Sequence, residues 1–380
     1  MSGSTSPLRS DFAPSVGPAE HTPFAVPRPL MSVIVPVHNK ASELSQCLAA
    51  LAECRGQECE LIVVDDQSTE NVREVATRFR ARYFCTPRRG GPALARNVGA
   101  KHALGGILLF VDADVVVPPG TLDLVRRCFA EDSDLVALFG SYDDEPACTD
   151  FYSTFKNLMH HHVHQSSNSD AVTFWAGCGA IRTEAFQALR GFDTEKYPMS
   201  SIEDIELGMR LVKNKQKIRL VKELQVKHLK RWSPGKLWQT DIFRRAVPWS
   251  RLILETHSVP NDLNLTWKSR TSACLVATLV VLLGSPVVHL AGLPMWRTRL
   301  VGGLVALNIF LLMFLNRGLY GFFCRKRGLR FAIGATLMHW LYLFYSGTTF
   351  SLCWIAEPFR MGLRSASPDL TLEHSRHDPQ

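Results

Sequence analysis

Short β-branched runs alternate with helical stripes through the first half of this 380-residue chain. Strands are predicted at MSVIVPV (31–37), ELIVVDD (60–66), near Tyr83, at ILLFVDAD (107–114) and at DLVALFGSY (134–142). Between the first two runs, apolar residues recur at the three- and four-residue spacing of an amphipathic helix. Strands that alternate with helices indicate an α/β fold with a mostly parallel, doubly wound sheet.

Polar side chains follow three of these strands at the point where each strand ends. They lie at residues 38–39, 65–68 and 112–114. In doubly wound sheets, ligands bind in the crevice outside the carboxyl ends of the strands. We therefore expect these strand ends to face one ligand-binding crevice.

Asp112 and Asp114 stand one residue apart at the end of an apolar run. Two carboxylates placed in this way can hold a divalent cation together with phosphate oxygens. Such a cation neutralises the charge that grows on a departing diphosphate. An acidic turn at the end of a strand is the alternative explanation for this short motif alone.

Several motifs occur in a fixed order between residues 31 and 257. They read VIVPVHN, VVDDQST, GGPALARNVGA, VDAD, GCGAIRTEAFQALRGFD, SIEDIELGMRL and KHLKRW. Together they resemble the inverting, nucleotide-sugar-dependent glycosyltransferases of family 2, which have the GT-A fold. The resemblance implies a transferase that uses a UDP- or GDP-sugar, a divalent metal (Mg or Mn) and a single inverting displacement.

The same resemblance assigns a donor site at the strand ends. Gly90 and Gly91 would allow the backbone to approach the nucleotide closely. Arg96 would contact the nucleotide or its diphosphate, and the alternative is that it is an ordinary charged residue on the surface of a helix. The residues expected to contact the nucleotide or its diphosphate are Pro36, His38, Asn39, Asp65, Asp66, Arg96, Asn97 and Asp112.

The resemblance also assigns the metal site and the general base. Asp112, Asp114 and His228 match the metal-binding positions, and Asp204 in IEDIE matches the base. Inversion needs a carboxylate opposite the leaving diphosphate to take the proton of the acceptor hydroxyl. Two alternatives stay open. Asp204 could be one of the acidic residues that are favoured in the first turn of any helix, and His228 could be a core histidine.

Acceptor contacts are expected downstream of the metal pair. Trp175 either stacks on a sugar or packs in the core, and His160 and His164, on one helical face, either contact the acceptor or form a metal pair. Processive relatives carry a Q-x-x-R-W motif, but no glutamine stands three residues before Arg231, so we expect transfer of one sugar per encounter. The predicted acceptor residues are Trp175, Gly177, Gly179, Glu203, Arg231 and Trp232.

The last third of the chain is much more apolar. The segments 271–293, 300–315 and 331–355 contain no Asp, Glu, Lys or Arg, and about 20 apolar residues suffice to cross a bilayer. The loop at 316–330 has more Lys and Arg than the one at 294–299, which predicts a cytosolic second loop. Buried helices of a soluble protein are the alternative.

The predicted organisation has five parts. We expect a disordered tail at 1–29, a GT-A domain at 30–232, interfacial amphipathic helices at 233–270, two or three transmembrane helices within 271–355, and a polar tail at 356–380. The protein would be a multi-pass protein of the inner (cytoplasmic) membrane with its catalytic domain in the cytosol.

Charge and cysteine content agree with this organisation. The net charge is +8, and many basic residues flank apolar segments, which favours an anionic membrane surface over nucleic acid. Ten cysteines without a C-x-x-C pair indicate a reducing compartment. We expect sugar transfer from a nucleotide sugar to a lipid, lipid-linked or cell-envelope acceptor. The alternatives are a non-catalytic, membrane-tethered nucleotide-sugar-binding protein and a glycosyltransferase with a soluble acceptor.

Overall fold

The computed structural model describes residues 29–54, 58–284 and 295–365. The tail predicted at 1–29 lies outside these ranges apart from its last residue, as do residues 366–380. Residues 356–365 of the predicted polar tail belong to helix α13 (Arg317–Ser365).

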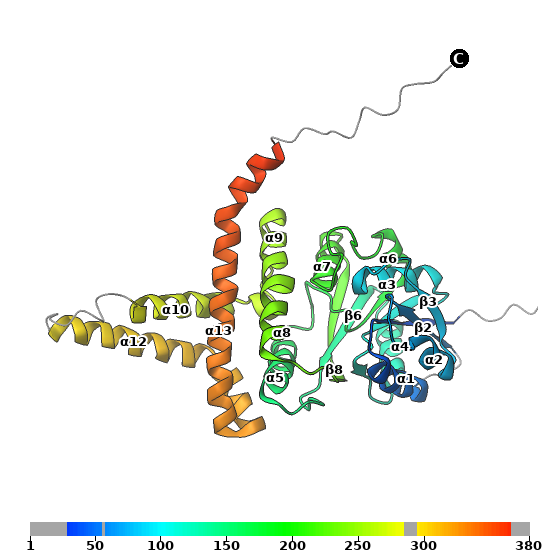
Figure 1. Ribbon diagram of the computed structural model, residues 1–380, viewed down its shortest axis with the longest axis horizontal. Coiled ribbons are helices and arrows are strands. Elements are labelled where there is room, and N and C mark those ends of the chain that lie inside the picture. Colours follow the sequence, from blue (N-terminus) through cyan, green and yellow to red (C-terminus); the bar gives the residue numbers. More distant parts are fainter. Residues whose placement is uncertain (1–28, 55–57, 285–294, 366–380) are drawn as a thin grey trace, which may run out of the picture.

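The described residues form one eight-stranded mixed sheet (Figure 1). Its order is β3-β2-β1-β4-β7-β6-β8-β5, with β7 antiparallel to both of its neighbours and β1 parallel to β2 and β4. The predicted α/β fold is confirmed, although the sheet is less uniformly parallel than expected. The strands are β1 (Met31–Val37), β2 (Cys59–Asp65), β3 (Arg82–Cys85), β4 (Ile107–Val111), β5 (Val115–Val116), β6 (Leu135–Tyr142), β7 (Cys178–Arg182) and β8 (Lys217–His228).

Both faces of the sheet are buried, which explains the unbroken apolar runs in the sequence. Successive side chains of a strand point to opposite faces. In β1, Val33 and Val35 join one core cluster with residues of the first and fourth helices, whereas Ile34 joins the cluster on the other face. The helices of this domain are α1 (Ala41–Cys54), α2 (Val72–Arg78), α3 (Gly91–His102), α4 (Thr121–Glu131), α5 (Phe151–Ser166), α6 (Thr183–Ala188) and α7 (Glu203–Lys213).

A helical segment follows the sheet, within the range predicted for interfacial helices. It consists of α8 (Pro234–Gln239), the π-helix η1 (Thr240–Ala246) and α9 (Val247–Thr256). A short 3₁₀ turn, η2 (Leu263–Leu265), then leads into α10 (Trp267–Gly284). The π-helix places its backbone and side chains beside the cavity described below.

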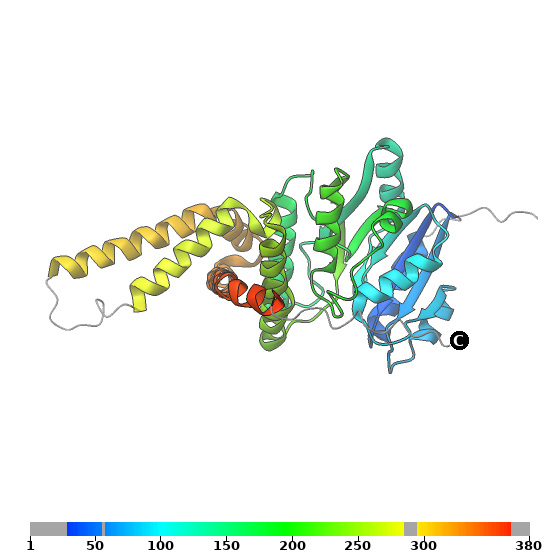
Figure 2. The same ribbon diagram turned by 90° about the horizontal axis from the view of Figure 1, so that it is seen from above.

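The C-terminal helices form two differently oriented parts (Figures 1 and 2). Helices α10 and α12 (Met295–Leu315) lie side by side and project away from the sheet domain. Helix α13, kinked at Gly328 where φ is +78°, runs across the base of this pair and along α9. It therefore lies between the projecting pair and the sheet domain.

Helix α13 is joined to the sheet domain by apolar and polar contacts. Phe323 and Leu319 pack with Phe155 of α5 in one cluster. The hydroxyl of Tyr345 donates a hydrogen bond to Oδ2 of Asp241 in η1, at 2.9 Å. These contacts fix α13 to the domain rather than to the projecting helices alone.

Among the described residues, one helix is long and apolar enough to cross a membrane. It is α12, with a mean hydropathy of 2.0 over its best window and only 11% of that window buried. The segment predicted at 271–293 is described only as far as Gly284, and the one at 331–355 lies within α13, against α5 and α9. The prediction of two or three transmembrane helices is therefore not confirmed.

Candidate active site

A cavity of about 450 Å³ lies at the carboxyl ends of the central strands. Its walls come from residues that follow β1, β2 and β4, from α3, α5 and the start of α7, and from β8 and η1. This is the position expected for a ligand in a doubly wound sheet. The predicted site residues that line it are Pro36, His38, Asp66, Arg96, Asp112, Asp114, Trp175, Gly177, Glu203, Asp204, His228 and Trp232.

Arg96 connects the two acidic parts of this cavity. This residue is 3% exposed, and its guanidinium donates to Oδ1 of Asp112 at 2.7 Å and to Oε1 of Glu203 at 2.9 Å. Glu203 also accepts a hydrogen bond from the backbone nitrogen of Ser201, at 2.9 Å. Glu203 is thus a buried partner of Arg96, and its role in binding the acceptor stays a prediction.

Asp114 lies deeper and has two basic neighbours. Lys40 forms an ion pair with its Oδ2 atom, and Nε2 of His228 lies 3.7 Å from the same oxygen. Burial alone would raise the pKa of Asp114, but His228 and Lys40 hold it well below its usual range. The ring of His228 stacks on Tyr142, with centroids 4.1 Å apart.

Asp66 shapes the loop that enters α3. Its carboxylate accepts hydrogen bonds from the backbone nitrogens of Gly90 (2.9 Å) and Gly91 (2.8 Å) and from the hydroxyl of Thr86 (2.9 Å). Gly91 has a φ of +73°, and a Cβ there would lie 3.0 Å from the backbone of Met199. Both oxygens of Asp66, which is predicted to contact the nucleotide or its diphosphate, therefore already accept hydrogen bonds from this loop.

Asp204 stands at the start of α7 and is partly buried. One oxygen accepts from the backbone nitrogen of Ala176 at 3.0 Å, and the other accepts from that of Ile205 at 2.9 Å. Burial and the neighbouring Glu203 raise the pKa of Asp204 to about 6. A carboxylate with this pKa is mostly ionised at pH 7 and is basic enough to accept a proton.

An aromatic cluster forms the wall beside α5. The Trp175 ring lies 4.9 Å from that of His160 and 5.0 Å from that of Tyr142, measured between centroids. His164 donates from Nδ1 to the carbonyl of Gly140 at 3.0 Å. Burial lowers the pKa of both histidines, that of His164 to about 4, so both rings are neutral at pH 7. Trp175 is packed within this cluster and also lines the cavity.

Five predicted site residues do not line the cavity. Asn97 exchanges hydrogen bonds with the backbone of Phe192, at 2.8 and 3.0 Å, and so fixes α3 to the segment after α6. Arg231 is exposed beside Asp150. The other three are explained by local structure. Asn39 and Asp65 accept hydrogen bonds from Thr69 and Ser68 of the loop after β2, and Gly179 is buried in β7 between Phe110 and Phe139.

Several basic residues of the cavity were not singled out from the sequence. They include Lys40 and Lys230, and also Arg244 and Arg245 of η1. Lys230 packs over the Trp232 ring, 4.0 Å from its centroid, and burial lowers the pKa of Lys230 to about 8. Lys40 directly follows the VIVPVHN motif, and Lys230 lies inside KHLKRW, so their positions next to these motifs were the available signal.

The donor set beside Asp114 fits a divalent cation only in part. Asp112 and Asp114 offer carboxylate oxygens, which suit Mg²⁺ or Mn²⁺, whereas the imidazole nitrogen of His228 suits softer metal ions better. Among the described residues, no group of three or more His, Cys, Asp and Glu side chains is placed to hold a metal ion. Lys40 already pairs with Asp114, so the protein offers few free donor atoms here. A cation bound at this place would therefore take the rest of its ligands from oxygens of the donor.

Comparison with known proteins finds a family that matches part of the domain lining this cavity. Residues 32–190 match the family model described as Glycosyl transferase family 2. These residues form a glycosyl transferase family 2 domain. The resemblance to family 2 found in the sequence motifs is thereby confirmed for these residues.

Several similar proteins are glycosyltransferases by name. Glycosyltransferase GlyG of Streptococcus pneumoniae serotype 4 is 32% identical over 164 residues, which cover 41% of this chain and 54% of that protein. An uncharacterized glycosyltransferase of Haemophilus influenzae is 34% identical over 119 residues, covering 30% and 47%. The chain thus spans about half the length of these relatives. Mannosyltransferase PcManGT of Pyrobaculum calidifontis, solved with GDP-Man and Mn²⁺, is 17% identical, covers 88% of each chain and has a TM-score of 0.45.

Proposed function

We propose that the protein transfers one sugar from a nucleotide-sugar donor to a lipid, lipid-linked or cell-envelope acceptor, with inversion at the anomeric carbon. One observation carries the proposal. A single cavity is lined by Asp112 and Asp114 at the end of β4 and by Asp204 at the start of α7. It therefore joins a pair of carboxylates suited to a cation that binds the donor diphosphate to a separate carboxylate suited to an acceptor hydroxyl.

In this mechanism Asp204 takes the proton of the acceptor hydroxyl. The bond from the acceptor oxygen to the anomeric carbon forms as the bond from that carbon to the diphosphate oxygen breaks. The hydrogen bond from Ala176 orients the Asp204 carboxylate, and the raised pKa makes it an effective base near neutral pH.

The departing diphosphate would meet a strongly basic wall. Lys40, Lys230, Arg244 and Arg245 all line the cavity and attract negative charge. A divalent cation with Asp112 and Asp114 as carboxylate ligands, and with diphosphate oxygens completing its coordination, would add further positive charge at the same place. Arg96 keeps the Asp112 carboxylate oriented toward that place through the contact at 2.7 Å.

A membrane location for the acceptor is supported by the projecting helices. Helix α12 is mostly exposed in spite of its apolar composition, with Phe310 61% exposed, and Val281 of α10 is 68% exposed. Soluble monomers rarely expose contiguous apolar surface of this kind. A bilayer would cover it and would bring lipid head groups to the domain.

The base assignment is tested by Asp204→Asn in the full chain. We expect sugar transfer to fall by at least ~10²-fold, within the usual range for removal of a general base, while UDP or GDP binding measured by calorimetry stays unchanged. Glu206→Asn, on the same helix but paired with Arg210, is the control. Transfer at the wild-type rate in the Asp204 variant would refute the mechanism, and donor binding without any transfer by the wild type would favour a binding protein.

A further inference from the structure

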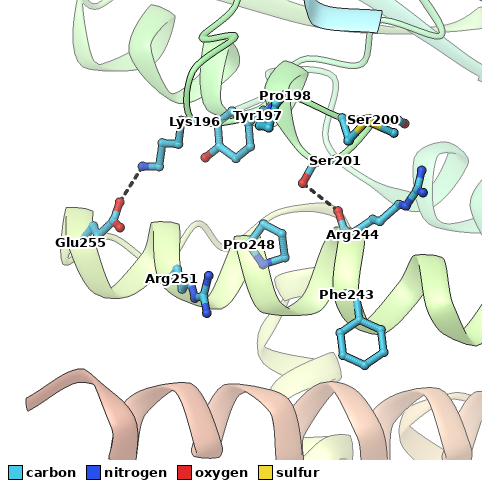
Figure 3. Close-up of a pocket in the computed structure, with 11 residues that line it drawn as sticks. Lys196, Tyr197, Pro198, Ser200, Ser201, Phe243, Arg244, Pro248, Arg251 and Glu255 are labelled. Atoms are coloured by element: carbon cyan, nitrogen blue, oxygen red, sulfur yellow. Dashed lines mark hydrogen bonds and ion pairs between the residues drawn. The ribbon is translucent and has the colours of Figure 1, made fainter. Parts of the chain in front are cut away.

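A second cavity, of about 540 Å³, lies beside the first (Figure 3). One wall is the loop 196–201 and the other is the helix formed by η1 and α9. Two contacts join these walls. The Ser201 hydroxyl donates to the carbonyl of Arg244 at 2.9 Å, and Lys196 pairs with Glu255 at 2.5 Å. The cavity lies between these two contacts, as Figure 3 shows.

The helical wall carries positive charge without a matching acid. Arg244, Pro248 and Arg251 recur at the spacing that places residues on one face of a helix. The acid of this cavity, Glu255, is already paired with Lys196. Neither arginine side chain forms an ion pair with another described residue, so the cavity retains the charge of two guanidinium groups.

A buried hydroxyl in the same cavity also has no partner. Tyr197 is 4% exposed, and its hydroxyl makes no hydrogen bond among the described contacts. In Figure 3 this hydroxyl points toward the space between Lys196 and Pro248. A buried hydroxyl that lacks a partner is costly, and a ligand with acceptor oxygens would satisfy it.

The second cavity adjoins the catalytic one and is open to apolar surface. Met199, Ser200, Ser201 and Arg244 line both cavities, so a molecule in one reaches the wall of the other. On the opposite side, Phe243 lines the second cavity, is 68% exposed and extends toward α13. The cavity thus combines unpaired cations, an apolar margin and access toward Asp204.

We infer that this second cavity binds the head group of a phosphate-bearing lipid, which is the acceptor of the proposed transfer reaction. The phosphate oxygens accept hydrogen bonds from Arg251 and the Tyr197 hydroxyl, and the lipid chain leaves past Phe243. The inference rests on the proposed function in one respect, since that function requires the acceptor hydroxyl to point toward Asp204. Binding of the head group can be measured independently of transfer.

Hexyl phosphate is a suitable water-soluble probe, titrated against the full chain in nanodiscs of neutral lipid. We expect saturable binding, weakened about 10-fold or more by Arg251→Met, because charge-assisted hydrogen bonds to phosphate are lost. Tyr197→Phe should weaken binding by a smaller factor. Arg127→Met, an exposed arginine of α4 on another part of the domain, is the matched control and should bind as the wild type does.

Three results would overturn the inference. They are binding unchanged in Arg251→Met, equal binding of the uncharged hexyl glucoside, and equal binding of inorganic phosphate, which would indicate a simple anion site. Asp204→Asn separates this inference from the proposed function. In Arg251→Met, loss of hexyl phosphate binding with sugar transfer intact refutes only the lipid site. In Asp204→Asn, transfer at the wild-type rate with hexyl phosphate binding intact refutes only the base.

Discussion

Protonation of Asp204 should control the pH dependence of transfer. Its pKa is raised to about 6 by burial and by Glu203, so kcat/KM should rise with pH up to about 6 and then level off as the base becomes ionised. Glu203→Gln removes the neighbouring negative charge, lowers the pKa of Asp204 and should shift this rise to lower pH. Glu206→Gln should leave it in place. A flat profile between pH 5 and pH 8 would contradict the assignment.

Arg96 should contribute to stability as well as to the site. Arg96→Met leaves the Glu203 carboxylate buried and unpaired, which typically costs about 3–5 kcal/mol of unfolding free energy. Arg78→Met removes an exposed pair with Glu74 at 4.0 Å and should cost at most ~1 kcal/mol. Chemical denaturation measures both. The combined variant with Glu203→Gln should recover part of the loss, and no recovery would argue against this pairing.

At the scale of elements, a buried polar contact holds α13 against η1. Asp241 accepts from Lys156 at 2.7 Å and from the Tyr345 hydroxyl at 2.9 Å, linking α5, η1 and α13. Tyr345→Phe removes one hydrogen bond to a charged group, worth about 1.5–3 kcal/mol. We expect faster amide exchange in α13 and η1 than in the wild type. Tyr152→Phe, on α5, is the control, and equal exchange in both variants would show that the contact does not hold the helix.

The strands and the acidic strand ends could be predicted because their signals are local. The alternation of β-branched runs with helical stripes fixed β1, β2 and β4, and the carboxyl-end rule then placed Asp66, Asp112 and Asp114 near one cavity. Lys40 and the Arg96–Glu203 pair could not be predicted in this way, because their partners lie 74 and 107 residues away in sequence. The location of the segment 331–355 could not be predicted either, because an apolar helix that packs on a domain and one that crosses a bilayer have similar compositions.

For the whole molecule, we expect the projecting helices to determine partition into membranes. Phe310→Arg together with Leu307→Arg places two charges on exposed positions of α12, each costing about 2.5–3.5 kcal/mol at the centre of a membrane helix. Flotation of the full chain with liposomes should show most of the variant in the soluble fraction. Leu104→Arg, an equally exposed leucine of the sheet domain, should float with the wild type. Equal flotation of all three proteins would exclude α12 as the anchor.

The crosswise position of α13 has a geometric consequence for the proposed reaction. A helix with its side chains is about 10–12 Å across, and α13 lies between the projecting pair and the sheet domain. If that pair enters a bilayer, α13 acts as a spacer that sets the height of the catalytic aspartate above the lipid surface. The enzyme would then select acceptors by the height of their hydroxyl above the lipid surface. A hydroxyl at the height of Asp204 is glycosylated, and one held closer to the acyl chains is not.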